Sequence, residues 1–456
     1  MKNCTATPGG RVNGTELLPF RSILFMALAT LTAQVAAAQT PFEVLYSFRG
    51  YGVADGAEPR GAVTISKDGA LYGTTYAGGT YGKGTVFELT PATGASWNET
   101  VIYSFSGVPD GAFPIAGLTF GSGGILYGAT PQGGTLSGTI FQLVPPSTAG
   151  GAWTETVLYT FDSSSLGQNR IPDGTVLVGP NGTLFTTARG SGNGTAVALT
   201  PPVTPGGSWT GAVIYTFGFA VGSFPLAGMV LEGGAFFGTD YFGVDLSCPS
   251  GGCGAVYELT PPATQGGAWT ETTIHSFTGP PADGAGSAAA LAVGPGGVLY
   301  GTTIWGGSGT PCYFPIGPGC GTVFQLTPPA APGGAWTESV IHSFTGLNGD
   351  GAFPMASVVV DKNGIIYGTT QYGGSATSGS PCTFTNVSGC GTVFELMPPA
   401  APGGAWTEKI LHSFSGRHGD GSQPLAGLAL SSTGVLYGTT SKGGTPGGGT
   451  VFAIKP

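Results

Sequence analysis

The chain has little charge. Only 8% of its 456 residues are Asp, Glu, Lys or Arg, and the acidic residues outnumber the basic ones by 23 to 14. Nucleic acids and anionic membranes are bound through clusters of Lys and Arg, which a chain of net charge −9 does not supply. The composition therefore argues against both kinds of partner.

The chain also lacks uninterrupted helical and apolar stretches. It contains 86 Gly and 36 Pro, and these recur throughout the sequence. Because both residues disfavour helix interiors, no run is long enough for a packed helix, which excludes helical repeats. The one apolar run of note is 23–31, and no other stretch is expected to cross a bilayer.

Residues 1–38 have the features of an export signal. Three basic residues precede or flank the apolar run, and three alanines end at Ala38, which suits signal cleavage. We therefore predict cleavage after Ala38 and a secreted, periplasmic or cell-surface protein. The alternative is an N-terminal membrane anchor, for which the apolar run is short.

One unit is repeated seven times along the chain. Its copies are 52 to 70 residues apart, a spacing that suits the four-stranded blades of a propeller. Each copy leads, after a Gly-rich stretch, into a strand of the Gly-Thr-Val-Phe kind. The copies of Leu-Tyr-Gly-Thr-Thr and its variants begin at Leu71, Leu126, Leu184, Phe236, Leu299, Ile366 and Leu436.

Each unit is predicted to form four strands. In the sixth unit these are 356–360, 365–370, 391–396 and 406–414, and Asn363-Gly364 between the first two is a hairpin signal. The alternation of apolar and polar residues in the third strand has the period of two that strands require.

The two ends of the chain are predicted to meet. The last unit stops at its third strand, 449–455, whereas 42–48 match the fourth strands of other units. The fold prediction is therefore all-β: residues 39–456 form a seven-bladed β-propeller, and the N-terminal strand completes the last blade. A closed ring leaves few strand edges exposed.

The repeated phrases LYGTT-x-x-GG, GTVFELTP, WTETVLY and DG-x-x-P-x-AG resemble those of the GloVer tandem-repeat family, the "choice-of-anchor" exported bacterial proteins. The resemblance covers nearly the whole chain after the leader. It implies an exported repeat protein and brings no activity or catalytic residue with it. Family members often end in a membrane or wall anchor, and we expect none here because the sequence ends at Pro456, directly after the predicted third strand.

Six cysteines follow the leader, and they occur in pairs in the loops between the second and third strands of units four to six. This placement predicts three local disulfides, which suit an oxidising compartment and would make the loops rigid. The alternative is metal binding by thiolates, but no Cys-x-x-Cys or partnering His accompanies them. The predicted pairs are Cys248–Cys253, Cys312–Cys320 and Cys382–Cys390.

Three histidines invite comparison with a catalytic triad. His275, His342 and His412 each replace the Tyr of the fourth strand in the phrase IHSF or LHSF. We therefore interpret them as one structural position on three blades, and not as a site of acid–base chemistry. His418 stands alone in a loop.

Acidic side chains recur in the loop that joins one unit to the next. They could line one mouth of the propeller channel and bind a cation, but Asp-Gly also starts tight turns through its side-chain oxygen, and we favour this structural role. No D-x-D-x-D-G spacing is present, and we predict neither a metal nor a cofactor. The carboxylates are Asp55, Asp110, Asp173, Asp283, Asp350 and Asp420.

The phrase Trp-Thr-Glu, at Trp153, Trp269, Trp336 and Trp406, could supply aromatic rings for sugars. Its regular place at the start of the outer strand indicates packing between adjacent blades instead. No nucleophile elbow, Walker loop or dinucleotide fingerprint is convincing. Gly-rich sequences match such patterns by chance, so partial matches here do not indicate a site.

The loops that break the repeat are the best candidates for function. The cysteine-bearing loops of units four to six are aromatic, and function tends to lie on variable loops held by a rigid scaffold. The alternative is that they are insertions that pack on themselves. The predicted ligand-binding residues are Tyr241, Phe242, Trp305, Tyr313, Phe314, Tyr372 and Phe384.

Our first functional hypothesis is an exported, non-enzymatic, monomeric propeller that binds a glycan or a surface protein through these loops. The second is an exported hydrolase or lyase that acts on polysaccharide, which would need a close acidic pair or a Tyr/His/Arg set at the channel. The third is a structural component of the cell surface that self-associates.

Overall fold

The computed structural model describes residues 42–456 except for short gaps. The predicted signal peptide, its cleavage site and His418 lie outside the described residues. The gaps are 94–95, 136, 149, 162–169, 191–192, 205, 219–222, 244–247, 249–251, 265, 310–311, 315–316, 332, 376–380, 385, 402 and 418.

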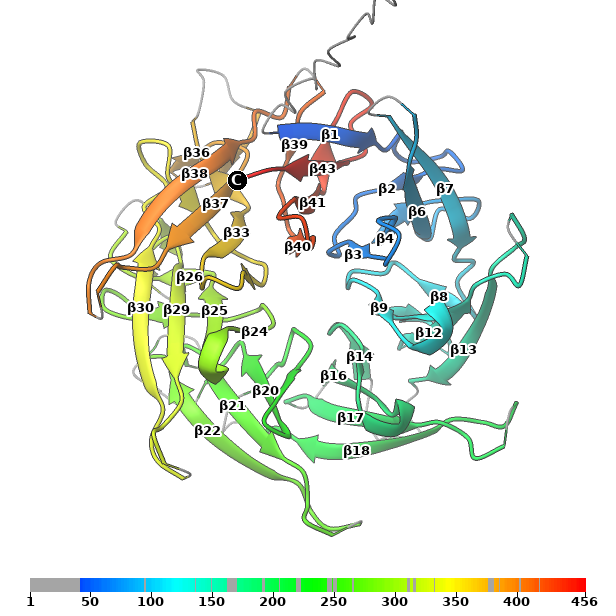
Figure 1. Cartoon of the computed structure of the whole chain (residues 1–456), viewed down its shortest axis with the longest axis horizontal. Helices are drawn as coiled ribbons and strands as arrows, with labels where there is room; N and C mark the ends of the chain where they lie inside the picture. Colours follow the sequence, from blue (N-terminus) through cyan, green and yellow to red (C-terminus); the bar gives the residue numbers. More distant parts are fainter. Residues whose placement is uncertain are drawn as a thin grey trace, which may run out of the picture. The chain divides into compact units, whose positions relative to one another are not determined.

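Seven antiparallel sheets stand in a ring, as predicted, and each is a blade whose strands lie side by side in order from the axis to the rim (Figure 1). Blades 1 to 4 are β3 (Thr64–Ile65), β4 (Leu71–Thr75), β6 (Thr85–Pro91) and β7 (Trp97–Ser104); β9 (Thr119–Phe120), β10 (Leu126–Thr130), β12 (Thr139–Val144) and β13 (Thr154–Thr160); β15 (Leu177–Val178), β16 (Leu184–Gly190), β17 (Thr195–Thr200) and β18 (Thr210–Thr216); and β19 (Val230–Glu232), β20 (Ala235–Asp240), β21 (Ala255–Thr260) and β22 (Thr270–Ser276).

Blades 5 to 7 follow the same order, and β14 (Arg170–Pro172) adds a further strand to the sheet of blade 3. These blades are β24 (Ala292–Val293), β25 (Leu299–Thr303), β29 (Thr322–Thr327) and β30 (Thr337–Ser343); β32 (Val359–Val360), β33 (Ile366–Thr370), β37 (Thr392–Met397) and β38 (Thr407–Ser413); and β40 (Ala429–Leu430), β41 (Leu436–Thr440), β43 (Thr450–Ile454) and β1 (Phe42–Ser47). In three blades a one-turn 3-10 helix joins the first two strands, at Ser122–Gly124, Pro180–Gly182 and Pro295–Gly297.

The innermost strands are shorter than the sequence predicts. In blade 6 only Val359 and Val360 pair with β33, whereas the prediction began at Ala356. The carbonyl of Ala356 instead accepts a hydrogen bond of 3.0 Å from the hydroxyl of Thr302 in blade 5. Backbone near the axis is therefore partly bonded to the neighbouring blade and not to its own sheet.

The first and last strands of the chain close the ring. β1 pairs antiparallel with β43 and forms the outer strand of blade 7, which confirms the predicted closure (Figure 1). The amide of Phe48 continues this pairing with a 2.9 Å hydrogen bond to the carbonyl of Gly449, and the Phe48 side chain is fully buried.

The repeated Leu-Tyr-Gly-Thr-Thr packs each blade against the next. In blade 1, Leu71 is fully buried, and the Tyr72 ring lies edge-on to Trp153 of blade 2, 5.8 Å away. Gly73 is required because a Cβ there would come within 2.4 Å of the Phe87 ring. Six tryptophans pack in this way, which confirms their predicted role, in the pairs Tyr72–Trp153, Tyr127–Trp209, Phe185–Trp269, Phe237–Trp336, Tyr300–Trp406 and Tyr437–Trp97.

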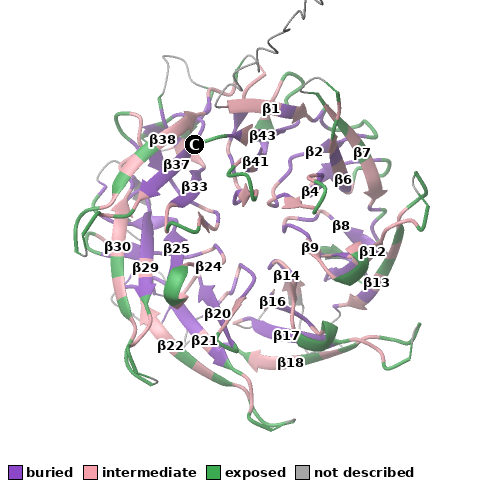
Figure 2. Ribbon diagram, in the orientation of Figure 1, coloured by how far each residue is buried: buried purple, intermediate pink, exposed green. Residues whose placement is uncertain are grey.

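The two threonines of the phrase satisfy buried backbone and side-chain groups. The Thr74 hydroxyl donates to the carbonyl of Ala116 in blade 2 at 2.9 Å. The Thr75 hydroxyl pairs with that of Thr85 on the third strand at 2.8 Å. The middle strands that carry these groups are buried, while the outer strands keep one partly exposed face (Figure 2). Among the described residues, no helix is long and apolar enough to span a membrane.

Blade 4 departs from this pattern. Asp240 occupies the place of the second Thr, and Tyr257 occupies the place of the Phe on the third strand. Both side chains are completely buried, and neither carboxylate oxygen of Asp240 nor the Tyr257 hydroxyl has a hydrogen-bond partner among the described residues. Burial, with the nearby Glu271, raises the pKa of Asp240 well above its usual value.

We expect Tyr257→Phe to stabilise the protein by about 1 kcal/mol, because it removes a buried hydroxyl without a partner and restores the residue of blades 1, 2, 5, 6 and 7. Thermal or urea unfolding measures the change. The matched control is Tyr215→Phe, which removes a half-buried hydroxyl. A destabilised Tyr257→Phe variant would contradict this account of blade 4.

We expect removal of residues 42–48 to lower the melting temperature by on the order of 5–10 °C, since the edge of β43 and the pocket of Phe48 become exposed. Scanning fluorimetry and light scattering should show a less stable protein that associates. The control is a chain that begins at Phe42. Equal stability and a monomeric state for both would rule out closure by β1 as a stabilising contact.

Candidate functional site

Two sets of loops share one face of the ring. Because neighbouring strands in a blade are antiparallel, the loop from the second to the third strand emerges at the same end as the loop that leads to the next blade. We call this the loop face. Short ladders join the two kinds of loop: β2 (Gly56–Ala57) with β5 (Ala77–Gly78), β8 (Gly111–Ala112) with β11 (Gln132–Gly133), β23 (Gly284–Ala285) with β26 (Trp305–Gly306), β31 (Gly351–Ala352) with β34 (Tyr372–Gly373), and β39 (Gly421–Ser422) with β42 (Lys442–Gly443).

On the loop face, six of the seven blades are bonded to the blade before them through the backbone of a single residue, and the described residues show no such bond for blade 3. In blade 6 the amide of Phe353 donates to the carbonyl of Cys320 in blade 5 at 2.8 Å, and its carbonyl accepts from the amide of Gln371 at 3.1 Å. We call this residue the clasp residue. Five other junctions have the same first bond: Glu58 to Gly448, Phe113 to Lys83, Phe224 to Asn193, Gly286 to Cys253 and Gln423 to Cys390.

The clasp residues adopt a left-handed backbone, which is unfavourable for any residue but Gly. Gly286 takes it without strain at φ +68°. At the other positions the strain is on the order of 1–3 kcal/mol, and such strain is concentrated at functional sites. The non-glycine clasp residues are Glu58 (φ 55°), Phe113 (57°), Phe224 (63°), Phe353 (58°) and Gln423 (54°).

The three disulfides brace the loops that receive the clasp. The bonds Cys248–Cys253, Cys312–Cys320 and Cys382–Cys390 confirm the predicted pairing. In each pair the second cysteine supplies the carbonyl that accepts the hydrogen bond from the next blade. The disulfides therefore fix the acceptor of the clasp at three consecutive junctions.

Five of the seven predicted aromatic residues lie in one continuous arc over blades 4 to 6. Its first part is in blade 4, where the Tyr241 ring lies 4.9 Å from that of Phe242, which in turn lies 5.4 Å from the clasp residue Phe224. The indole N–H of Trp305 in blade 5 donates to the Tyr241 hydroxyl at 3.3 Å, which joins the two blades.

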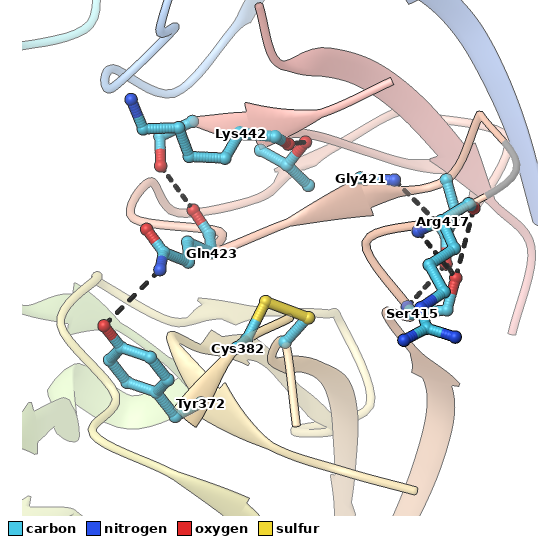
Figure 3. Close-up of a disulfide and its surroundings, with 11 residues drawn as sticks. Tyr372, Cys382, Ser415, Arg417, Gly421, Gln423 and Lys442 are labelled. Carbon is cyan, nitrogen blue, oxygen red and sulfur yellow. Dashed lines mark hydrogen bonds between the residues drawn. A yellow bond between two sulfur atoms is a disulfide. The ribbon is translucent and has the colours of Figure 1, made fainter. Parts of the chain in front are cut away.

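The second part of the arc begins at Trp305, whose ring lies 4.9 Å from Phe353. Phe353 contacts Phe384 at 5.4 Å, and Phe384 stacks on Tyr372 with 5.2 Å between the ring centres. The side-chain Nε2 of Gln423 in blade 7 donates to the Tyr372 hydroxyl at 3.4 Å, beside the Cys382 disulfide (Figure 3). The aromatic arc comprises Phe224, Tyr241, Phe242, Trp305, Phe353, Tyr372 and Phe384.

Members of the arc differ in exposure. Trp305 and Phe353 are buried, with 7% and 2% of their surface exposed, and pack against the more exposed members of the arc. Phe224, Tyr241, Phe242, Tyr372 and Phe384 are half-buried and keep accessible edges. Tyr313 and Phe314 form β27, which pairs with β28 (Gly317–Pro318), and their side chains lie outside the described residues. In blade 6, β35 (Thr383–Phe384) pairs with β36 (Val387–Ser388).

A charged cluster follows the arc on the loop face. The clasp residue Glu58 in blade 1 accepts hydrogen bonds from Lys442 of blade 7, from Tyr51 and from Arg60. Burial alone would raise the pKa of Glu58, but these hydrogen bonds lower it to about 2. The Arg60 guanidinium also lies over the ring of Tyr76, 3.7 Å from its centre. The Glu58 carboxylate is thus ionised and fully engaged.

The predicted acidic loops use their carboxylates to hold the turn. The Asp283 carboxylate accepts from the amides of Thr278 and Gly284 at 2.8 and 2.6 Å. These two bonds hold the turn, and the Asp283 carboxylate lies 3.4 Å from His275 on the outer strand β22. The same two bonds are made by Asp55, Asp110, Asp350 and Asp420.

Asp173 does not belong to this set. The sequence analysis placed it with the other loop carboxylates, but it follows Pro172, whose ring takes the place of Pro114 in the neighbouring loop. A Cβ on Gly138 would meet Pro172 at 3.0 Å, just as one on Gly84 would meet Pro114 at 2.8 Å. Asp173 therefore lies beyond the turn, where Arg189 binds it.

The Glu of Trp-Thr-Glu lies at the junction between two blades, close to a Tyr and an Asp of the preceding blade. The sequence analysis did not predict this group of three side chains. The Tyr103 hydroxyl on blade 1 donates to Asp110 at 2.9 Å and lies 3.5 Å from Glu155 on blade 2. Burial, with the nearby Asp110, raises the pKa of Glu155 to about 7. The pKa is also about 7 for the equivalent residues Glu99, Glu338 and Glu408.

We expect the protein to lose stability as pH rises from about 4.5 through 7. A carboxyl whose pKa is higher in the folded than in the unfolded state binds more protons when folded, so its ionisation destabilises the fold. Glu99→Gln and Glu155→Gln remove this effect, so each variant should melt about 1–2 °C above the parent at pH 8 and near it at pH 5.

Scanning calorimetry from pH 5 to 8 measures this difference. Glu43→Gln is the matched control, since this Glu also lies on an outer strand and pairs across to Ala453 on β43. If the Glu99 and Glu155 variants follow the parent at every pH, these carboxyls do not share the proposed burial and charge repulsion.

A family model described as the Gloeobacter/Verrucomicrobia repeat matches residues 32–248 and 172–385. A search of curated protein sequences finds no match. Solved structures with a similar chain include a gluconolactonase of Xanthomonas campestris (12% identity over 91% of this chain and 89% of that chain, TM-score 0.38), a protein from Lactobacillus plantarum (15%, 79% and 86%, 0.47) and polysaccharide lyase Uly1 (11%, 92% and 94%, 0.49).

Proposed function

The chain belongs to the Gloeobacter/Verrucomicrobia repeat family, and we propose that it is an exported, non-enzymatic member that binds glycan through the aromatic arc. The observation that carries the proposal is the continuity of this arc over three blades. An elongated row of half-exposed rings suits an elongated ligand with apolar faces, such as the sugar rings of a polysaccharide.

Rigidity supports a binding role. The clasp bonds hold Phe224 and Phe353 at the backbone, and disulfides brace the loops of all three blades of the arc. A surface that is already ordered before the ligand arrives loses little conformational entropy on binding. Polar groups lie at the end of the arc, where Gln423 and Lys442 could bind sugar hydroxyls.

The alternative hypothesis of a hydrolase or lyase has less support. A general acid or base must be free to exchange a proton with the substrate. On the loop face, Glu58 is paired with Arg60 and Lys442, and Asp173 is paired with Arg189. These two carboxylates of the loop face are thus engaged in ion pairs, which favours binding over catalysis there.

Export and a monomeric state are part of the same proposal. Three disulfides suit a secreted, periplasmic or cell-surface location, and the predicted signal peptide ending at Ala38 would deliver the chain there. The closed ring leaves no blade without an outer strand, so association through sheet edges is not needed for stability.

We expect Tyr372→Ala combined with Phe384→Ala to weaken glycan binding at least about tenfold, because the variant removes the stacked pair at the exposed end of the arc. A polysaccharide array identifies the ligand for the parent protein, and calorimetry then compares affinities. The control is Tyr81→Ala, which removes a ring that is 60% exposed on blade 1, away from the disulfide loops.

Two results would overturn the proposal. One is a parent protein that binds no polysaccharide on the array. The other is a glycan whose affinity falls as much in Tyr81→Ala as in the double variant. Binding of a surface protein to the parent, lost in the double variant, would keep the arc as the site and replace the ligand class.

A further inference from the structure

Two blade junctions differ from the others in the chemistry of their side chains. Between blades 4 and 5, His275 of β22, Asp283 of the connecting loop and Glu338 of β30 converge. The ligand atoms of this group all lie within 4.8 Å of one another. The junction of blades 5 and 6 repeats the arrangement with His342, Asp350 and Glu408.

The separations within these groups are long for hydrogen bonds. The Nε2 atom of His275 lies 3.4 Å from Asp283, and that of His342 lies 3.7 Å from Asp350 and 3.5 Å from Glu408. Two ligands bound to one zinc ion at about 2.1 Å in tetrahedral geometry are about 3.4 Å apart. The spacing therefore suits atoms that share a metal ion.

Several of these atoms have no hydrogen-bond partner among the described residues. Nε2 of His275 and of His342, and Oε1 of Glu338 and of Glu408, are buried and accept or donate no hydrogen bond among the described residues. At the junction of blades 1 and 2 the Tyr103 hydroxyl stands in the place of the His and reaches Asp110. Replacing Tyr by His shortens the side chain and leaves room between the polar atoms.

The surroundings hold the three side chains in place. The amides of Thr278 and Gly284 orient the Asp283 carboxylate, and the His275 ring lies edge-on to Phe277 at 4.9 Å. The equivalent His342 ring lies 4.5 Å from Phe344. Groups that orient the ligands in this way are a regular part of metal sites.

The third histidine provides an internal comparison. His412 lies 3.3 Å from Asp420, but Phe42 of β1 occupies the place of the Glu. The Phe42 ring stacks on His412, with 3.6 Å between ring centres and a 2° interplanar angle. This junction lacks the second carboxylate and is filled by an aromatic ring.

We propose that His275, Asp283 and Glu338, and likewise His342, Asp350 and Glu408, each bind one divalent first-row transition-metal ion such as Zn²⁺. One imidazole and two carboxylates supply three ligands, and water completes the coordination. Each ion would join the outer strands of adjacent blades across the disulfide-braced part of the ring. The sites are separate from the aromatic arc, so they do not depend on the proposed glycan binding.

The test uses the leaderless protein without a histidine tag, stripped of metal with a chelator. We expect calorimetric titration with Zn²⁺ to give two ions per chain, His275→Tyr or His342→Tyr to give one, and the double variant to give none. Tyr is the natural residue of this position at the junctions that carry Tyr46, Tyr103, Tyr159 and Tyr215, so these variants should fold. Their thermal unfolding without metal checks this.

A second measurement separates built sites from chance binding. Co²⁺ should give a visible absorption band in the parent and in His412→Tyr, and no band in the double variant. Zn²⁺ should also raise the melting temperature of the parent but not that of the double variant. The proposal is overturned if the parent binds no Zn²⁺ at a concentration of about 100 µM. It is also overturned if the double variant still binds two ions.

Discussion

The structure depends on a hydrogen bond between the backbones of neighbouring blades. Each clasp residue donates its amide to the loop of the blade before it. The carbonyl is bonded within its own blade in all of them except Phe113, where Pro131 has no N–H to donate. Glu58 adds an ion pair with Lys442 of blade 7, but the clasp bond itself is made by the backbone and does not depend on the side chain. It can therefore be Glu, Phe, Gly or Gln in different blades, and the constraint that secures the ring also displays variable groups on the loop face.

Features that repeat in the sequence were predictable because one physical explanation had to serve all copies. Seven blades, closure by 42–48, three local disulfides and the packing of Trp between blades all follow from aligned positions. Each depends on contacts within a blade or between equivalent residues of adjacent blades. The histidines were placed correctly for the same reason, since His342 pairs with Val323 as Tyr103 pairs with Val86.

What the sequence did not reveal depends on backbone conformation and on contacts between different positions of the repeat. A residue before Pro is normally extended, so nothing marked Phe353 as left-handed. The group of Tyr103, Asp110 and Glu155 joins three unlike positions over 52 residues. Asp173 was misplaced because its Asp-Gly letters match while Pro172 sets the register. The one available signal was that the residue before the loop Pro differs from blade to blade, as Glu, Phe or Gln, although the residues around it repeat.

The pairing of β1 with β43 also means that the ring closes only after the chain has been synthesised as far as β43. The first described strand begins at Phe42, and its partner is synthesised only when the chain reaches Thr450. A chain that emerges N-terminus first keeps β1 unpaired until almost every other residue has been delivered. Premature termination anywhere before β43 leaves β1 without its partner, so incomplete chains carry an open edge that quality-control proteases and chaperones can recognise.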